Sequence, residues 1–199
     1  MTEADAPRPR LWVVRHGATE WSGEGRHTGS IDIPLTEEGR AQARTLAPAL
    51  ARHTFAEVLT SPRSRAEDTC RLAGFGDRAR IDPDLAEWDY GEDEGRTTAE
   101  IKKDRPGWSI WRDGPKGGES IEHVAERTDR VIKLARAADG DVLAFSHGHL
   151  LRILAARWVG LPARDGRLLL LDPATLSVLG WDRDSPVLEH WNLEPPGQG

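Results

Sequence analysis

Leu11-Trp12-Val13-Val14-Arg15-His16-Gly17 is the stretch that decides the fold of this 199-residue chain. Its four apolar residues, bounded by polar ones, predict a buried strand. Arg15, His16 and Gly17 then stand at the carboxyl end of that strand, where open α/β sheets bind ligands. The guanidinium of Arg15 offers a fixed fork of donors suited to phosphate, and a neutral His16 can act as a nucleophile. The stretch therefore indicates an α/β protein with an anion site beside its first strand.

The rest of the chain alternates strand-like apolar runs with amphipathic helical ones, which favours a layered α/β fold. Thr36 can cap a helix from residue 37 to about 53 that Pro48 should kink or shorten. Ser120 can cap a helix to about residue 138, and residues 142–145 predict a central buried strand. We expect further strands at 57–60, 80–81, 168–171, 177–181 and 188–192, helices at 63–72, around 101–103 with Thr98 as cap and at 149–159, and an ordered loop at 108–118.

Length and composition indicate one soluble globular domain. We expect it to span residues 10–194, with flexible tails at 1–9 and 195–199. Hydrophobic residues make up 38% of the chain and charged residues 30%. The single Cys70 excludes an internal disulfide and is interpreted as a buried core residue.

Charge and hydropathy narrow the classes of partner. The formal net charge of −6 lacks the basic footprint of a nucleic-acid-binding protein. It is compatible with an anionic substrate, because a pocket can be locally basic. Residues 1–10 hold no apolar run that would make a secretory signal, and no segment approaches the ~18 apolar residues of a membrane span. We expect a cytoplasmic monomer or homodimer with a small-molecule substrate and without a nucleic-acid or membrane partner.

Three further motifs follow the first one along the chain. They are Ser-Pro-Arg-Ser-Arg-Ala-Glu-Asp-Thr at residues 61–69, Leu-Ala-Glu-Trp-Asp-Tyr-Gly-Glu-Asp-Glu-Gly at 85–95 and Ser-His-Gly-His at 146–149. Together with Arg15-His16-Gly17, this order resembles the histidine phosphatase superfamily, which includes the phosphoglycerate mutases and many acid phosphatases. The resemblance implies a three-layer α/β/α fold with a mostly parallel central sheet, and chemistry that needs no cofactor and no metal.

Five residues match the catalytic set of that superfamily. The resemblance implies that His16 is the nucleophile that forms a phosphohistidine, and that Arg15 and Arg65 clamp the phosphoryl group. It also implies that His147, cationic or donating, contacts the phosphoryl oxygens opposite His16. Glu87 matches the general acid, whose carboxyl must hold a proton for the leaving alkoxide. Arg63, near the clamp, is interpreted as a solvated cation at the start of a helix.

Six other residues are expected to bind substrate. Ser22 stands where many family members carry Asn, and either side chain can donate a hydrogen bond to phosphate. The N–H groups of Gly148 and His149 could form an anion-binding helix end, although the His149 side chain is interpreted as a supporting or capping group. The remaining expected contacts are Thr28, Gly29 and Trp111, the last of which could form part of the substrate mouth.

Residues 111–114 and 117–120, with the 87–91 run, resemble a narrower branch of sedoheptulose-bisphosphatase-like and broad acid phosphatases. This implies a phosphomonoester hydrolase acting on phosphorylated sugars or small organic phosphates. A phosphoglycerate mutase is an alternative, although mutases resembled here usually carry longer loops than residues 95–120. A non-catalytic phospho-ligand binder and a metal hydrolase using His16, His147 and His149 are further alternatives. The intact catalytic set speaks against the binder, and no matching Asp/His cluster supports the metal hydrolase.

Overall fold

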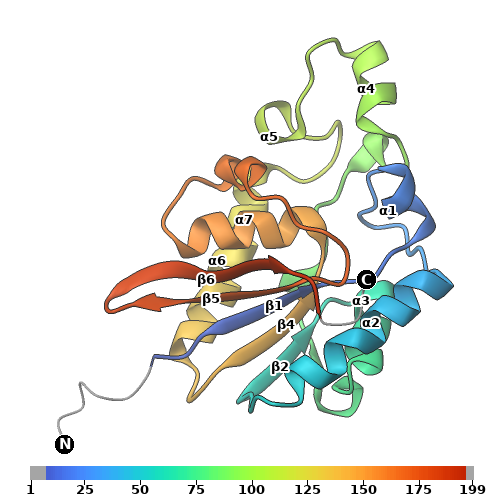
Figure 1. The fold of residues 1–199 in the computed structure, drawn as a ribbon. Coiled ribbons are helices and arrows are strands. Elements are labelled where there is room, and N and C mark those ends of the chain that lie inside the picture. The colour runs from blue at the N-terminus through green and yellow to red at the C-terminus, as the bar shows by residue number, and fades with distance from the viewer. Residues whose placement is uncertain (1–7, 196–199) are drawn as a thin grey trace, which may run out of the picture.

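A six-stranded sheet with helices on both faces forms the fold in the computed structural model, which describes residues 8–195 (Figure 1). The strands lie in the order β3-β2-β4-β1-β5-β6. Their bounds are β1 Leu11–Arg15, β2 Glu57–Thr60, β3 Arg80–Ile81, β4 Val142–Ser146, β5 Leu176–Asp182 and β6 Ser185–Leu193. The helices are α1 Glu20–Glu24, α2 Glu37–Leu50, α3 Ser64–Leu72, α4 Thr98–Asp104, α5 Ile110–Asp113, α6 Ile121–Ala137 and α7 Gly148–Trp158.

The four strands β3, β2, β4 and β1 are parallel, and β5 and β6 add an antiparallel hairpin at the β1 side. The central strands β1 and β4 are in register from Leu11 opposite Val142 to Arg15 opposite Ser146. Both strands therefore end at the same edge of the sheet, and His16 and His147 follow directly after these ends. The expected three-layer fold with a mostly parallel sheet is confirmed.

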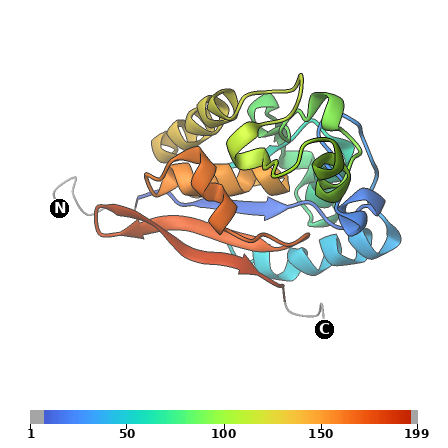
Figure 2. The same cartoon turned by 90° about the horizontal axis from the view of Figure 1, so that it is seen from above.

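The two faces of the sheet bury two separate cores. Leu11 and Val13 pack with residues of α6 and α7, whereas Trp12 and Val14 pack with residues of α2 and α3. Figure 2 shows α6 and α7 on one face of the sheet and α2 on the other. Successive side chains of a strand point to opposite faces, so a strand covered on both sides must be apolar throughout. This is why residues 11–14 are all apolar and do not alternate between apolar and polar side chains.

Cap residues fix the helix starts near where the sequence predicted them. The Thr36 hydroxyl accepts a hydrogen bond from the N–H of Gly39, and the Ser120 hydroxyl accepts one from the N–H of His123. α2 includes Pro48 but ends at Leu50, three residues earlier than expected. The cap of α4 is Thr97 rather than Thr98, because Thr97 forms a reciprocal capping box with Glu100.

Two expected elements were wrong, and both lie beside the site. The 108–118 segment contains the short helix α5. In place of the strand expected at 168–171, a short 3-10 helix ends at Leu168 and residues 169–171 are irregular. The carbonyls of this second segment face other partners: that of Leu170 accepts from the indole of Trp191, and that of Leu171 accepts from Arg15. These carbonyls are therefore satisfied by side chains and not by a neighbouring strand.

The expected tails lie largely outside the described residues, which exclude 1–7 and 196–199. The part that is described is held on the sheet, since the carbonyl of Pro9 accepts a hydrogen bond from the indole of Trp181. Cys70 is buried, as expected, and burial raises the pKa of its thiol to about 12. Within residues 8–195, none of the helices has the length and apolar character needed to cross a membrane.

Candidate active site

His16 is the residue around which the site is built. It follows β1 directly and is 5% exposed. Its Nδ1 lies 2.8 Å from the carbonyl oxygen of Gly17, which can only accept, so Nδ1 carries the proton and the lone pair is on Nε2. Burial, followed by the charges of Arg65 and Arg15, lowers the pKa of His16 well below its usual value. The ring is therefore neutral, with one unprotonated nitrogen.

Gly17 is required by packing beside this ring. A Cβ at Gly17 would lie 2.3 Å from the carbonyl oxygen of Gly39 in the first turn of α2. The N–H of Gly17 also donates to the hydroxyl of Thr69 on α3. The glycine therefore lets the loop after β1 approach α2, whereas its sequence position suggested close approach to a ligand.

Arg15 presents the donor that the site leaves unused. Its Nη1 donates to the carbonyl of Leu171 at 2.5 Å. Its buried Nε has no hydrogen-bond partner among residues 8–195, and burial lowers the pKa of the group without removing its charge at neutral pH. A Cβ placed on Gly148 would lie 3.4 Å from this Nε, so the missing side chain leaves the donor uncovered. A buried, unpartnered cationic donor next to His16 is suited to an anionic oxygen.

His147 lies across from His16, with the two ring centroids 5.1 Å apart. Its Nδ1 accepts from the Nε of Arg65 at 3.2 Å, so its Nε2 carries the proton, which points to the hydroxyl of Ser61 at 2.6 Å. Burial and the nearby charge of Arg65 lower the pKa of His147 well below its usual value. Of the two expected forms, cationic or donating, this structure has the donating one, and its proton is directed to Ser61. Both ring nitrogens already have protein partners.

Arg65 also differs from its expected geometry. Its side chain is fully buried, and its fork faces main-chain carbonyls: those of Thr28 and Gly29 at Nη2 and that of Ile31 at Nη1. It is not among the residues that line the cavity. Arg65 thus supplies a fixed positive charge behind the two histidines and anchors the 28–31 loop. Arg63 was expected to be a solvated cation, but its Nε is buried and has no hydrogen-bond partner among residues 8–195.

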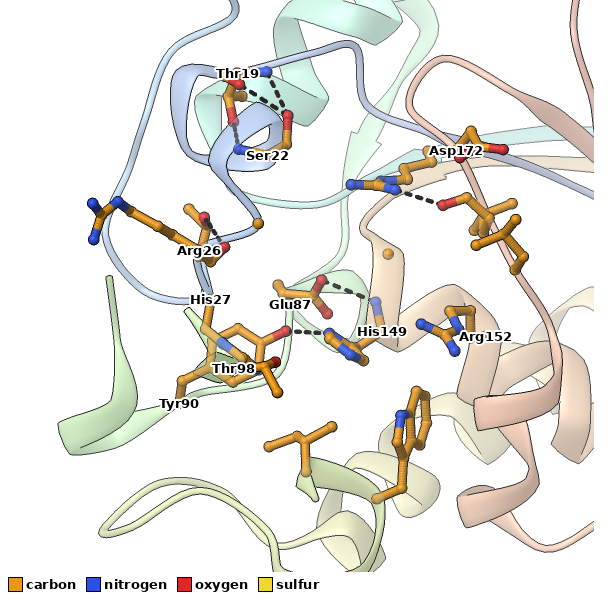
Figure 3. Close-up of a pocket in the computed structure, with 18 of the residues that line it drawn as sticks. Thr19, Ser22, Arg26, His27, Glu87, Tyr90, Thr98, His149, Arg152 and Asp172 are labelled. Atoms are coloured by element: carbon orange, nitrogen blue, oxygen red, sulfur yellow. Dashed lines mark hydrogen bonds between the residues drawn. The ribbon is translucent and has the colours of Figure 1, made fainter. Parts of the chain in front are cut away.

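Glu87 is held by three main-chain N–H groups. One carboxyl oxygen accepts from the N–H groups of Trp88 and Leu150. The other accepts from that of His149, the bond drawn in Figure 3. Two of these donors belong to the first turn of α7. The expected anion-binding end of this helix is therefore largely occupied by the Glu87 carboxylate, which leaves the N–H of Gly148.

A buried arginine fixes the segment that carries Glu87. Arg127 on α6 donates from Nη1 to the carbonyls of Asp84 and Ala86, at 2.7 and 2.9 Å. Its Nε and Nη2 form a two-point ion pair with Glu119. The hydroxyl of Ser146, at the end of β4, donates to the carbonyl of Leu85. The 84–86 segment is thereby tied to both α6 and the sheet.

A cavity of about 460 Å³ opens in front of these groups. It is lined by four cationic side chains, Arg15, Arg26, Lys102 and Arg152, and by two carboxylates, those of Glu87 and Asp172. Although the protein is acidic as a whole, this cavity is locally positive and suits an anionic ligand. Figure 3 shows Arg152 and Asp172 on one side and Arg26 on the other.

The six expected substrate-binding residues are only partly brought together. Ser22, Thr28, Gly148, His149 and Trp111 line the cavity, but Gly29 does not. A Cβ on Gly29 would lie 2.3 Å from the carbonyl of Trp88, so this glycine serves packing beside the Glu87 segment. The Ser22 hydroxyl is engaged with the main chain of Thr19 in a capping box, with its hydrogen donated to the Thr19 carbonyl.

Several cavity-lining residues were not among the predicted site residues, and the polar ones include His27, Tyr90, Lys102 and Arg152. His27 directly precedes the expected contact Thr28, and Tyr90 lies inside the motif at 85–95, so a local sequence signal exists for both. Lys102 on α4 and Arg152 on α7 carry no motif signal. Among residues 8–195, no group of three His, Cys, Asp or Glu side chains gathers in a metal-binding arrangement, so the metal-hydrolase alternative lacks a ligand set.

The chain is similar to known proteins over most of its length. The model of the histidine phosphatase superfamily (branch 1) matches residues 11–194. An acid phosphatase of Mycobacterium tuberculosis is 40% identical over 177 residues, which cover 87% of each chain. A sedoheptulose 1,7-bisphosphatase of Saccharomyces cerevisiae is 37% identical, over 77% of this chain and 68% of that protein. A solved structure of an open reading frame from Mycobacterium tuberculosis superposes with a TM-score of 0.89 at 38% identity, and covers 94% of this chain and 98% of the other.

Proposed function

The chain belongs to the histidine phosphatase superfamily, and from this premise we propose that it is a cofactor-independent phosphomonoesterase acting through a phosphohistidine at His16. Its substrates are phosphorylated sugars or other small organic phosphates. The relatives named as an acid phosphatase and a sedoheptulose 1,7-bisphosphatase support hydrolysis as the reaction class.

The observation that carries this proposal is the tautomer of His16. Its Nδ1–H donates to the Gly17 carbonyl, which leaves a lone pair on Nε2 in a ring that stays neutral. A histidine with these properties is ready to attack without a separate base. The unpartnered Nε of Arg15, directly before it in the chain, is a donor for an oxygen of the same phosphoryl group.

In the first step, the Nε2 lone pair forms a bond to phosphorus and the bond between phosphorus and the alcohol oxygen breaks. The electron pair goes to that oxygen, which takes a proton from the Glu87 carboxyl and leaves as a neutral alcohol. Arg15 binds the phosphoryl oxygens, and the buried charge of Arg65 stabilises the anionic group from behind the histidines. His147 holds Arg65 and Ser61 in place.

In the second step, water attacks the phosphorus of the phosphohistidine and the bond between phosphorus and nitrogen breaks. The Glu87 carboxylate takes a proton from that water, so the carboxyl is ready for another cycle. Inorganic phosphate leaves, and His16 returns to its neutral form. The hydrogen bonds to Glu87 from the 88, 149 and 150 N–H groups keep its carboxyl at one position through both steps.

Rapid-quench kinetics on the purified protein test the proposal. Sugar phosphates should release inorganic phosphate, and alkaline quenching should trap an acid-labile phosphoryl group on His16 within the first turnover. Given 3-phosphoglycerate with a trace of its bisphosphate, the protein should release phosphate rather than accumulate 2-phosphoglycerate. Isomerisation without phosphate release would identify a mutase instead, and binding without turnover would identify a phospho-ligand binder.

A further inference from the structure

The imidazole rings of two further histidines line the same cavity as His16 and take no part in the proposed steps. The rings of His27 and His149 are nearly parallel, with an interplanar angle of 8° and centroids 6.0 Å apart. Indole rings hold both of them: Trp108 lies edge-on to His27 at 5.6 Å, and Trp111 lies against His149 at 5.1 Å. The imidazole pair is thus an ordered part of the cavity wall.

His27 offers an acceptor to the cavity. Its Nδ1 lies 2.9 Å from the main-chain carbonyl of Arg96, which can only accept, so Nδ1 carries the proton. No hydrogen bond from residues 8–195 reaches Nε2, whose lone pair is left for a ligand. Burial lowers the pKa of His27, which keeps the ring neutral and Nε2 unprotonated at neutral pH.

His149 offers a donor. Its Nδ1 lies 2.7 Å from the hydroxyl of Tyr90, as Figure 3 shows. Burial raises the pKa of Tyr90 well above its ordinary value, so the phenol keeps its proton. The phenol has no other hydrogen-bond partner among residues 8–195, so we assign its proton to the contact with Nδ1. With that assignment, Nε2 of His149 carries the ring proton, and the two rings present opposite hydrogen-bonding characters.

The acceptor on His27 and the donor on His149 determine which kind of substrate group can bind between them. An unprotonated Nε2 on His27 cannot hydrogen-bond an anionic phosphoryl oxygen, because both atoms are acceptors and neither carries a proton. The pair therefore serves the leaving-group part of the substrate. A hydroxyl can donate to His27 and accept from His149, and two neighbouring hydroxyls can use both rings at once. The indole rings of Trp108 and Trp111 supply apolar surface for the carbon chain between them.

We propose that His27 and His149 form a hydroxyl-recognition pair, and that the preferred substrates are phosphomonoesters of polyhydroxy alcohols rather than of plain alcohols. The inference rests on the proposed phosphatase function and narrows its substrate class. Tyr90 is a positioning residue in this pair, since its hydroxyl fixes which nitrogen of His149 is the donor.

Paired substrates test the inference directly. Glycerol 1-phosphate and 1-propyl phosphate have the same carbon count, but only the first carries free hydroxyls. We expect the wild-type protein to prefer glycerol 1-phosphate in kcat/KM by at least about tenfold, as sites built around a substrate hydroxyl do. His27→Phe and, separately, His149→Phe should each remove most of that ratio. Tyr90→Phe should reduce the ratio while it leaves the ring packing in place.

Matched controls separate the possible failures. His190 is exposed on β6, so His190→Phe makes the same chemical change away from the cavity and should leave the ratio unchanged. Circular dichroism reports folding of each variant, and His27→Gln, which keeps a hydrogen-bonding group, should retain part of the preference. Equal use of both substrates by the wild type, or a ratio that survives both Phe variants, would overturn the hydroxyl pair while leaving the phosphatase intact. A preference for phosphoethanolamine over glycerol 1-phosphate would also overturn it. Hydrolysis of neither phosphomonoester would instead count against the proposed function.

Discussion

The inner and outer ends of the cavity are built in different ways. At the inner end, His16 and His147 follow directly after the adjacent parallel strands β1 and β4, and main-chain groups orient both His16 and Glu87. At the outer end, α4, α5 and the irregular segment near residue 171 supply the walls. Lys102 there is exposed and has no ion-pair partner among residues 8–195.

This difference in construction suggests that the inner end carries out the chemical step and the outer end selects the substrate. The inner groups have positions set by the sheet register, so their geometry depends on the most buried part of the protein. The outer groups depend on short helices, which can change without disturbing the sheet. We therefore expect inner substitutions to abolish or strongly reduce turnover of every substrate, and outer substitutions to shift the relative use of substrates.

Removal of the nucleophile should have the largest effect. His16→Ala should lower kcat by at least about 10³-fold, since loss of a nucleophile removes the covalent route. The acid-labile phosphoryl group should disappear with it. Rapid-quench assays measure both, and His190→Ala serves as the matched control. A variant at position 16 that still accumulates the phosphoryl group would contradict the assignment.

Glu87→Gln should come next, with an effect that depends on the leaving group. Sugar alkoxides leave poorly and need a proton, and a general acid contributes about 10²- to 10⁴-fold. Nitrophenolate leaves well, so p-nitrophenyl phosphate should lose much less in the burst phase. Steady-state rates are unsuitable here, because Glu87 also serves the second step. Equal burst losses for both substrates would show that another group donates the proton.

The two arginines of the second motif should differ in size of effect. Arg65→Ala removes a fully buried charge beside both histidines and frees the carbonyls of Thr28 and Gly29. Loss of hydrogen bonds to a charged group of about 1.5–3 kcal/mol corresponds to a decrease of at least about tenfold in kcat/KM. Arg63→Ala should be milder. A larger loss for Arg63→Ala would make its buried, unpartnered Nε the phosphate donor instead.

The sequence located the strands and caps at the inner end of the cavity, but not the long-range contacts of its side chains, for a physical reason. Strand β1 is continuously apolar because both of its faces are covered, and its end therefore locates Arg15 and His16 directly. The cap at Thr36 is equally local, since one hydroxyl binds an N–H three residues away. The neutral state of His147 depends on burial and then on the charge of Arg65, which is 82 residues distant along the chain. No pattern in a single sequence encodes that contact.

The same limit applies to the segment that was expected to form a strand at residues 168–171. Its apolar run fits a strand, but its carbonyls bind Arg15 and Trp191 instead of a neighbouring strand. Gly17 and Gly29 likewise looked like ligand contacts, and their close approaches are to other main-chain segments. In these cases the residue type indicated an apolar segment or a close approach of the backbone. Which group each one contacts was decided by the fold.

The buried histidines should make stability depend on pH in a defined window. Burial lowers the pKa of His16, His27, His147 and His149, so below about 6.5 the unfolded chain binds more protons than the folded one. The free energy of unfolding should therefore be fully retained above pH 6.5 and fall as the pH decreases below it. Urea denaturation between pH 7.5 and about 5, above the usual carboxyl range, measures this. His27→Phe should reduce the slope, and a slope unchanged by it would contradict a neutral His27.

Lys102→Ala should have the smallest effect and completes the contrast between the two ends. The side chain is exposed on α4, lines the cavity and binds no carboxylate among residues 8–195, so its loss leaves no buried group uncompensated. An exposed charge interacts weakly through water, at about 0–1 kcal/mol, which predicts a change in kcat/KM within about fivefold. The change should appear in KM rather than kcat, because the group is remote from the reacting atoms, and it should diminish as salt screens the charge. Matched assays at low and high ionic strength check this. A decrease in kcat comparable with that of Arg65→Ala would mean that the outer end takes part in the chemical step.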